Sequence, residues 1–321
     1  MTSTHNHETW AELLHSAVHT PGKLLAAYTA FHNYSFGNAL LALTQCRRRN
    51  LEPGPLNTYR GWLELKRQVR KGEKGITLCM PMQYKKRVRK DDAQEDESEE
   101  VTRSTFGFRA YWFVLVQTDG EAMDTVPTPG FDLETALRTL NITRTRFDEM
   151  NGNIQGFATG REIAVSPIAA IPHKTTFHEI AHCVLQHTTN EKLVDSEDTP
   201  INLREVEAEA VALICCETLN LVGAEYARGY IQHWLKGEKE IPNHNAARIF
   251  TAASTILKAG NVEEGRVEPR FDLRTSTFLS TATAFGRDII EPSISPHCCG
   301  GTMGRRRPSC ISHGLLEEHD E

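Results

Sequence analysis

The first 50 residues repeat their apolar positions with the period of a helix. One stripe that fits a single helical face comprises Leu13, Leu14, Ala17 and Val18. Pro21 suits the first turn of a second helix, and Ser35 can cap a third helix whose apolar positions run over residues 36–46. The pattern therefore predicts three helices in this part of the chain.

Strand patterns follow after a short capped helix. A tight turn over residues 71–75 leads into a strand over Ile76–Met80. A second strand is expected over Phe108–Val116, which is rich in aromatic and β-branched residues. Residues 85–103, between the strands, hold a basic block followed by an acidic block, and we interpret them as a mobile hairpin loop.

A second domain is expected after residues 125–130, which have the proline-rich composition of a linker. From Phe131 the pattern predicts helices, with a strand near residues 161–165 and a long helix over residues 203–219. After Arg287 the composition turns to Ser, Pro, Gly, Cys and charge. We therefore expect an α+β protein with an N-terminal α+β domain (1–125), a mainly helical second domain (131–288) and a disordered Cys-rich tail (289–321).

The charge of the chain is divided unevenly between its two ends. Residues 1–90 hold fifteen Lys/Arg and five Asp/Glu, a net charge of +10, so residues 91–321 carry −16 of the total of −6. Such a division suggests that the N-terminal part faces a polyanion, although a solvated basic face would have the same composition.

The sequence contains no apolar segment of the length of a signal peptide or a membrane span. We therefore expect a cytoplasmic protein with no membrane partner. The eight cysteines are scattered over 321 residues, which favours reduced thiols over a disulfide framework.

The segment His178-Glu179-Ile180-Ala181-His182 places two histidines four residues apart. On a helix they lie about 40° apart around the axis, so both imidazoles can point at one ion. Glu179 then lies beside the open position of the ion without being a ligand, and it can take a proton from a water that attacks a carbonyl. This pattern is typical of zinc-dependent amide hydrolysis.

Two carboxylates on the next long helix supply what the motif lacks. A gluzincin-type zincin takes its third ligand from a second helix, often with an acid four residues later that hydrogen-bonds a ligand histidine. Glu205 and Glu209 have this spacing and share a face with Ala212 and Cys216, where unpaired carboxylates would be costly to bury. We assign Glu205 as the third ligand and Glu209 as the partner of a ligand histidine, with the reverse left open. The expected cofactor is one Zn²⁺ per chain, with Mn²⁺ as an alternative.

A helix start without a metal is the alternative interpretation of this segment, because Thr176 and Glu179 also fit a capping box. Glu207 points away from its two neighbours and is expected to be solvated. His187 is one residue short of the third histidine of a metzincin, so it is not assigned as a ligand. The cysteines expected in the core, and not among the ligands, are Cys183, Cys215 and Cys216.

Basic and aromatic residues alternate between Arg47 and Lys74. Proteins that bind single strands need cations along the phosphates and aromatic faces on which bases stack. The candidate contacts are Tyr59, Arg60, Trp62, Arg67, Arg70, Lys71 and Lys74. Trp62 equally suits the core of its own helix. No signature of base-specific readout is present, so the expected partner is single-stranded DNA bound without sequence preference.

At this point the sequence resembles a known family, the ArdC-type antirestriction proteins of conjugative plasmids, which are related to plasmid primases. In the N-terminal half the resemblance lies in Tyr34–Leu41, Tyr59–Leu65, Gln68–Gly75 and Phe108–Gly120. In the second half it lies in His178–His182, Glu205–Glu209 and Tyr230–Leu235. Lys66 stands where the family often has glycine. The resemblance adds Tyr34 and Asn38 to the candidate DNA contacts.

The resemblance implies single-stranded DNA binding by the first domain, a zincin-like metallopeptidase fold in the second, and protection of plasmid DNA from host restriction. The leading hypothesis is therefore an antirestriction factor with a zinc peptidase site that acts on an unidentified protein, such as a restriction subunit or a repressor. One alternative is a non-enzymatic protein that shields DNA and has a structural metal site. Another is a regulatory protease that resembles the ImmA/IrrE group and cleaves a DNA-bound repressor.

Overall fold

The computed structural model describes residues 7–89, 98–124, 127–188, 192–196, 202–236 and 240–262. In these ranges it combines helices with several small sheets, which confirms the predicted α+β class. The helices are α1 (Trp10–Val18), α2 (Lys23–Phe31), α3 (Phe36–Arg48), α4 (Tyr59–Glu64), α5 (Leu133–Thr139), α6 (Pro172–Val184), α7 (Leu203–Thr218), α8 (Ala224–Leu235) and α9 (Asn243–Ala259), with a 3-10 turn, η1 (Leu115–Gln117). The strands are β1 (Leu56–Thr58), β2 (Arg67–Val69), β3 (Ile76–Arg89), β4 (Ser98–Val114), β5 (Thr118–Gly120), β6 (Gly130–Phe131), β7 (Thr143–Arg144), β8 (Ile154–Thr159), β9 (Glu162–Val165), β10 (Lys192–Ser196) and β11 (Asn261–Val262).

The three predicted N-terminal helices are present. Helix α1 begins with a capping box, in which Thr9 accepts a hydrogen bond from the backbone N–H of Glu12 and the Glu12 carboxylate accepts one from Thr9. The expected position of Pro21 is wrong, because α2 begins only at Lys23. Gly22 precedes the helix in the left-handed conformation, at φ 79°, and Pro21 lies in the turn before it.

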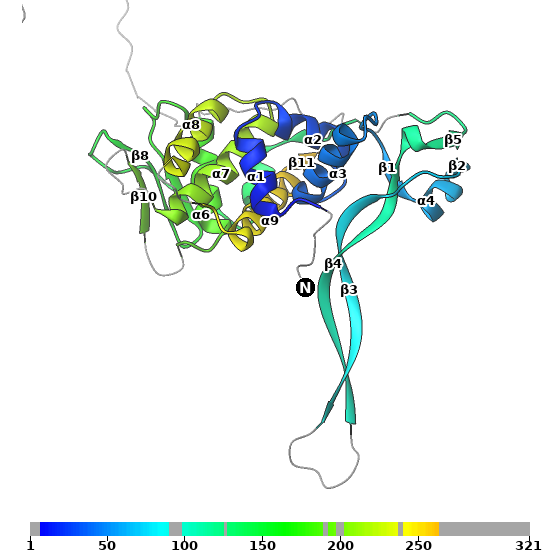
Figure 1. Ribbon diagram of the computed structural model, residues 1–321. Coiled ribbons are helices and arrows are strands. Elements are labelled where there is room, and N and C mark those ends of the chain that lie inside the picture. The colour runs from blue at the N-terminus through cyan, green and yellow to red at the C-terminus, as the bar shows by residue number, and fades with distance from the viewer. Residues whose placement is uncertain are drawn as a thin grey trace, which may run out of the picture. The chain divides into compact units, whose positions relative to one another are not determined.

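Strands β3 and β4 form a long antiparallel ribbon that runs from Ile76 paired with Trp112 to Arg89 paired with Ser98 (Figure 1). The expected loop over residues 85–103 is therefore wrong at both of its ends, and only residues 90–97 of it lie outside the described residues. The register pairs Arg87 with Glu100, so the basic and acidic blocks lie on facing strands. Charge composition alone indicated a loop, whereas the partner strand determines the pairing.

Helix α3 completes the edge of this sheet with side-chain amides. The order of strands is β1-β4-β3, so one edge of β3 is open. Asn38 donates to the carbonyl of Cys79 at 2.9 Å and accepts from its N–H at 2.8 Å. Gln45, two turns later on α3, bonds both backbone groups of Thr77 at 2.8 Å. These amides take up the backbone groups that Thr77 and Cys79 would otherwise leave unpaired at the edge.

In the second half, β8 lies between β10 and β9 and is antiparallel to both, while β7 joins β9 in parallel. Helix α6 packs against β8 and β9 on one side and against α7 on the other. Helix α7 is buried from Glu205 to Thr218, as is typical of a helix enclosed by other helices. The candidate metal residues therefore lie inside the fold.

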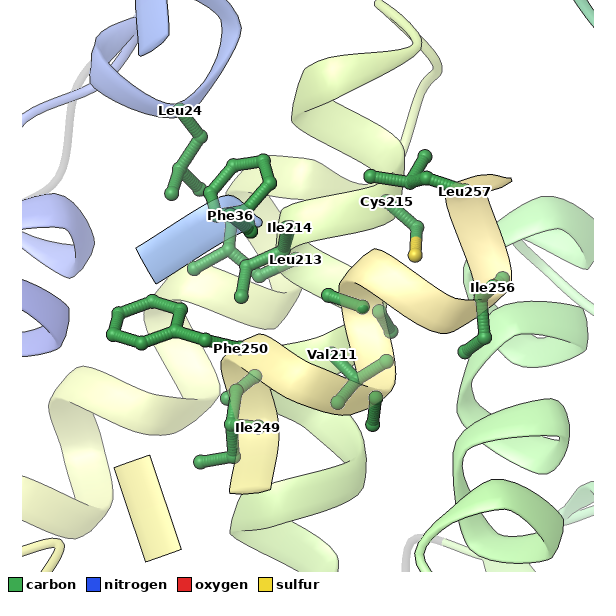
Figure 2. Close-up of a cluster of buried hydrophobic side chains, with 14 of the residues drawn as sticks. Leu24, Phe36, Val211, Leu213, Ile214, Cys215, Ile249, Phe250, Ile256 and Leu257 are labelled. Atoms are coloured by element: carbon green, nitrogen blue, oxygen red, sulfur yellow. The ribbon is translucent and has the colours of Figure 1, made fainter. Parts of the chain in front are cut away.

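The N-terminal helices share one hydrophobic core with α7 and α9. Leu24 of α2 and Phe36 of α3 lie beside side chains of these two helices (Figure 2). The rings of Phe36 and Phe250 stack with centroids 6.3 Å apart. The described residues on both sides of the expected boundary at residues 126–130 belong to one compact unit. The domain limits drawn from the sequence stay a prediction, but the core is continuous across them.

The predicted tail, residues 289–321, lies outside the described residues. Among the described helices, none combines the length and the apolar character needed to span a membrane.

Candidate metal centre and nucleic-acid surface

Helix α6 carries the HEIAH segment in its second half and not at its start. The helix begins at Pro172, which suits a first helical position because it lacks an N–H. The hydroxyl of Thr176 donates to the carbonyl of Pro172 at 2.7 Å, as an interior helical residue does. The capping-box alternative for Thr176 and Glu179 is therefore wrong.

Helix α7 begins just before the two predicted carboxylates. Its N-cap, Asn202, accepts hydrogen bonds from the backbone N–H groups of Arg204 and Glu205, at 2.9 and 3.2 Å. This cap fixes Glu205 in the first turn of the helix, and Glu209 follows one turn later on the same face. That face lies against α6.

The structure brings His178, His182 and Glu205 together in a buried cluster whose donor atoms could hold one metal ion. The Nε2 atoms of the two histidines are 3.0 Å apart, and Oε2 of Glu205 lies 3.3 Å from Nε2 of His178 and 3.5 Å from Nε2 of His182. Donors bound at about 2.0–2.1 Å with tetrahedral angles are about 3.3 Å apart. The three side chains therefore fit an ion of that geometry.

Glu209 holds the other nitrogen of His178. Its Oε2 lies 2.9 Å from Nδ1 of His178 and 3.1 Å from Nζ of Lys174. The carboxylate accepts from Nδ1–H, so the lone pair of the imidazole is on Nε2, toward Glu205. This geometry favours Glu205 as the ligand and Glu209 as the outer partner over the reverse assignment.

Ionisation of these groups follows from their burial and their partners. Burial lowers the pKa of His182 to about 4, although Glu205 opposes this shift in part. The low pKa keeps the imidazole neutral. Burial raises the pKa of Glu205, but hydrogen bonds from His178 and His182 outweigh it and hold that pKa well below its usual range. His182 therefore offers a neutral nitrogen and Glu205 an ionised carboxylate, which are the forms that bind metals.

The carboxylate of Glu179 lies on another face of α6, toward β8. The side chain is 1% exposed. A Cβ atom added to Gly156 of β8 would lie 2.8 Å from Oε1 of Glu179 and 2.7 Å from Cγ2 of Thr175. The glycine therefore leaves the space that the carboxylate occupies beside the metal residues.

Sequence reasoning missed a second set of partners, around His182. Nδ1 of His182 lies 3.0 Å from Nδ1 of His187, whose Nε2 lies 3.0 Å from Oε2 of Glu207. The expectation that Glu207 is solvated is wrong, since its side chain is 2% exposed. The signal that could have found it is α7 itself, because an acid on a helix that is buried all round must have partners.

The cysteines near the centre are core residues, as expected. Cys183, Cys215 and Cys216 are buried free thiols and do not belong to the group that could hold a metal. Burial raises the pKa of Cys183 to about 11 and that of Cys216 to about 12, which keeps both as thiols.

Three of the candidate DNA contacts have their side chains engaged inside the fold. The assignment of Trp62 as a DNA contact is wrong. Its ring is 1% exposed and its Nε1–H donates to the carbonyl of Phe113 at 2.8 Å, so it is not free to stack on a base. The hydroxyl of Tyr34 donates to the carbonyl of Leu56 at 2.6 Å. Asn38 binds the edge of β3, as described above.

The other candidates lie on α4, β2 and the turn that follows. Tyr59 is 45% exposed and, together with Gln68, Arg70 and Lys71, lines a concavity of about 690 Å³. Lys71 and Lys74 are exposed. The remaining arginines also have protein partners: Arg60 pairs with Glu64, Arg67 binds Thr118, and Arg70 binds the carbonyl of Val116 and the carboxylate of Glu73.

The fold and the donor cluster define an α+β protein with a buried candidate metal centre. Residues 5–113 match the family model of the N-terminal domain of anti-restriction factor ArdC. This match confirms the predicted resemblance of the N-terminal part of the chain to ArdC-type proteins.

Among solved structures, the chain is similar to the antirestriction ArdC protein from the R388 plasmid. The metal-free structure of that protein is 20% identical, with a TM-score of 0.46, over 78% of this chain and 94% of that one. Its Mn(II)-bound structure is 18% identical, with a TM-score of 0.42, over 78% and 95% of the two chains. A search of the curated proteins found no match.

Proposed function

We propose that this chain is an antirestriction protein of a mobile element that joins single-stranded DNA binding to a zinc-dependent peptidase site. The observation that carries the peptidase part is the buried cluster of His178, His182 and Glu205, with donor atoms 3.0 to 3.5 Å apart. The ArdC-type domain over residues 5–113 supports the antirestriction part. Manganese is the second candidate ion, since carboxylate donors suit it.

In this proposal His178, His182 and Glu205 hold the ion. A bound zinc ion would polarise a peptide carbonyl and lower the pKa of a coordinated water. Glu179 accepts the proton of the attacking water at its carboxylate and returns it to the amine that leaves. Glu209 supports the ion indirectly, because it keeps the lone pair of His178 on Nε2.

The proposed DNA surface is the concavity around Tyr59 with the exposed lysines beside it. Bases of a single strand can stack on the exposed ring of Tyr59, while Lys71 and Lys74 face phosphates. A duplex hides the base faces, so single strands should bind better. The arginines of this region have intramolecular partners, and their main contribution is to hold the surface in place.

The two sites act together in the proposed function. The acidic remainder of the chain is repelled by DNA and is free to meet a protein, whereas the basic part holds the DNA. Because both sites lie on one compact unit, DNA binding raises the effective concentration of the peptidase site near other proteins on the same DNA. The proposed substrate is therefore a DNA-bound protein, such as a restriction subunit or a repressor.

The metal part is tested by elemental analysis of the full chain. After purification with zinc and dialysis, we expect about one equivalent of metal, and most of it should be lost in His178→Ala. Full occupancy in a variant with both His178→Ala and His182→Ala would exclude these residues as the site.

The peptidase part is tested by restriction of an incoming plasmid in cells that express the full chain. Glu179→Gln should retain metal and DNA binding but lose protection, because only the proton transfer is removed. Glu162→Gln, at the exposed first residue of β9, is the matched control and should protect normally. Full protection by Glu179→Gln would instead favour shielding of DNA by a non-enzymatic protein.

A further inference from the structure

The end of α6 turns back on itself in a way that returns His187 to the metal cluster. The helix ends at Val184, and Gln186 adopts the left-handed conformation, at φ 62°, which is uncommon outside glycine. The backbone N–H of His187 then donates to the carbonyl of His182 at 2.9 Å. Their rings meet edge to face with centroids 5.2 Å apart, and the ring of His187 is thus placed by the backbone against a predicted ligand.

The hydrogen atoms of this contact can be assigned from its far end. Glu207 is the acceptor in this contact, because Nδ2 of Asn245 and the guanidinium of Arg248 both donate to its Oε1 and Arg248 supplies the countercharge of an ionised carboxylate. Nε2 of His187 must therefore carry the proton that it donates to Glu207. In a neutral ring this leaves Nδ1 of His187 as an acceptor.

The tautomer of His187 determines that of His182 in turn. Nδ1 of His182 lies 3.0 Å from the unprotonated Nδ1 of His187, so Nδ1 of His182 must be the donor. The lone pair of His182 is consequently on Nε2, the atom that lies 3.5 Å from Oε2 of Glu205. Glu209 imposes the same tautomer on His178 from the other side.

Helix α9 fixes the far end of this chain of hydrogen bonds. Nδ2 of Asn245 donates to Oε1 of Glu207 at 2.8 Å, and a guanidinium nitrogen of Arg248 lies 3.3 Å from the same oxygen. Arg248 also donates to the carbonyl of Leu185, in the turn that ends α6. Because both donors occupy Oε1, the other oxygen of Glu207 is left to face His187.

We propose that His187 and Glu207 are positioning residues that set the tautomer of His182 and so present its Nε2 lone pair to the metal ion. This inference rests on the proposed metal site but goes beyond it, since His187 does not belong to the group of residues that could hold the ion. A buried His187 that only filled space would tolerate any tautomer. Partners of ligand histidines typically change metal affinity by about 10- to 100-fold when they are replaced.

The decisive variant is Glu207→Gln, which preserves shape but reverses one set of hydrogens. The donors Asn245 and Arg248 require the amide oxygen to face them, so the NH₂ group must face His187. His187 then accepts at Nε2 and carries its proton on Nδ1, which leaves Nδ1 of His182 as the acceptor and puts a proton on Nε2. We expect Zn²⁺ and Co²⁺ to bind this variant about 10- to 100-fold more weakly.

The matched control is Glu217→Gln, the same change at another buried acid of α7, which faces α8 and the N-terminal helices. It should lower the stability of the protein but leave metal affinity unchanged. Affinities are measured on the full chain by competition with a chromophoric chelator. Arg248→Met, whose side chain is half-exposed, is a milder variant that keeps the test usable if Glu207→Gln does not fold.

Nitrogen NMR of the histidine rings provides a readout that a structural role would not change. In the wild-type chain, with or without Zn²⁺, the proton of His187 should be on Nε2, and Glu207→Gln should move it to Nδ1. A wild-type proton on Nδ1, or affinity within about twofold of wild type in folded Glu207→Gln, overturns the proposal. If the wild-type chain binds neither ion, the proposed metal site fails, while the tautomer of His187 is still decided.

Discussion

Glu217 on α7 and Arg228 on α8 form a buried ion pair whose remaining bonds reach the first two helices of the chain. Arg228 donates to the carbonyls of Ala17 and Val18, at the end of α1, at 2.9 and 2.6 Å. Glu217 accepts from the N–H of Leu24, at the start of α2, at 2.9 Å. The cation closes a helix C-terminus and the anion closes an N-terminus, which is the favourable polarity for both.

We expect Arg228→Met to destabilise the protein by about 3–5 kcal/mol, because it leaves the buried carboxylate of Glu217 without its partner. Adding Glu217→Gln should restore part of the loss, since the unpaired charge is removed. Equilibrium unfolding of the full chain in urea measures both effects. A loss below about 1 kcal/mol would show that the pair is no more than a surface ion pair in its effect. A fragment of residues 1–125 should also be poorly folded, because it lacks α7 and α9 and so exposes Leu24 and Phe36.

The metal cluster could be predicted from the sequence because helical spacing alone decides which side chains share a face. His178 and His182 recur after one turn, as do Glu205 and Glu209, and no tertiary knowledge was needed to pair them. The roles of Glu207 and His187 could not be predicted in this way. They depend on a left-handed residue at the end of α6 and on donors from α9, which are distant in sequence.

The DNA surface and the ribbon show the same limit. Trp62 could be stacked on a base or buried, and only the position of the carbonyl of Phe113 on β4 decides between them. Residues 85–89 and 98–103 pair as strands although their charge suggests a loop, because each supplies the other's backbone partners. Composition describes one segment at a time, whereas the burial of Trp62 and the pairing of the ribbon both depend on a neighbouring strand.

Exposed lysines should account for the salt dependence of DNA binding. We expect Lys71→Gln combined with Lys74→Gln to reduce the slope of log K against log salt by about 1.4, at about 0.7 for each phosphate contact on a single strand. Tyr59→Leu should weaken binding by about 1–3 kcal/mol with little change of slope, since it removes stacking. Fluorescence anisotropy with a labelled oligonucleotide measures both, with exposed Lys236→Gln as the control. Unchanged slopes in the lysine variant would move the DNA surface elsewhere.

Tyr34 should act in stability and not in DNA binding. Burial raises its pKa to about 12, and its hydroxyl donates to Leu56. A raised pKa in the folded state means that the contribution of Tyr34 is complete below its unfolded pKa, near 10, and is lost as the pH rises toward 12. Tyr34→Phe should therefore be less stable than wild type at neutral pH. Above pH 10 its free energy of unfolding should fall less than that of wild type. DNA affinity should equal that of wild type, and a clear decrease would restore Tyr34 as a contact.

Lys66 has the left-handed conformation, with φ 56°, which is uncommon outside glycine. A side chain in this region is strained by about 1 kcal/mol. We expect Lys66→Gly to stabilise the protein by up to about 1 kcal/mol, after the entropy of glycine in the unfolded chain is subtracted. Lys66→Ala is the control, because it removes the exposed ion pair with Glu121 but keeps the strain. Equal effects of the two variants would contradict the explanation.

Gly156→Ala tests whether Glu179 must lie where it does. Thr175 and Glu179 of α6 lie next to Gly156 of β8, whereas His178 and His182 meet Glu205 of α7, so a change at Gly156 acts first on Glu179. The new methyl carbon would lie 2.8 Å from Oε1 of Glu179, closer than van der Waals contact allows, and the carboxylate would have to move. Displacement of a proton-transferring group by about 1 Å typically costs about 100-fold in rate. We therefore expect protection of an incoming plasmid to fall nearly as far as in Glu179→Gln, while metal content stays at about one equivalent.

Gly160→Ala, at the exposed turn after the same strand, is the control for substitution near β8, and it should lose stability but not protection. If Gly156→Ala loses its metal together with protection, the two faces of α6 are not independent, and the role assigned to Glu179 is not separated from that of the ligands.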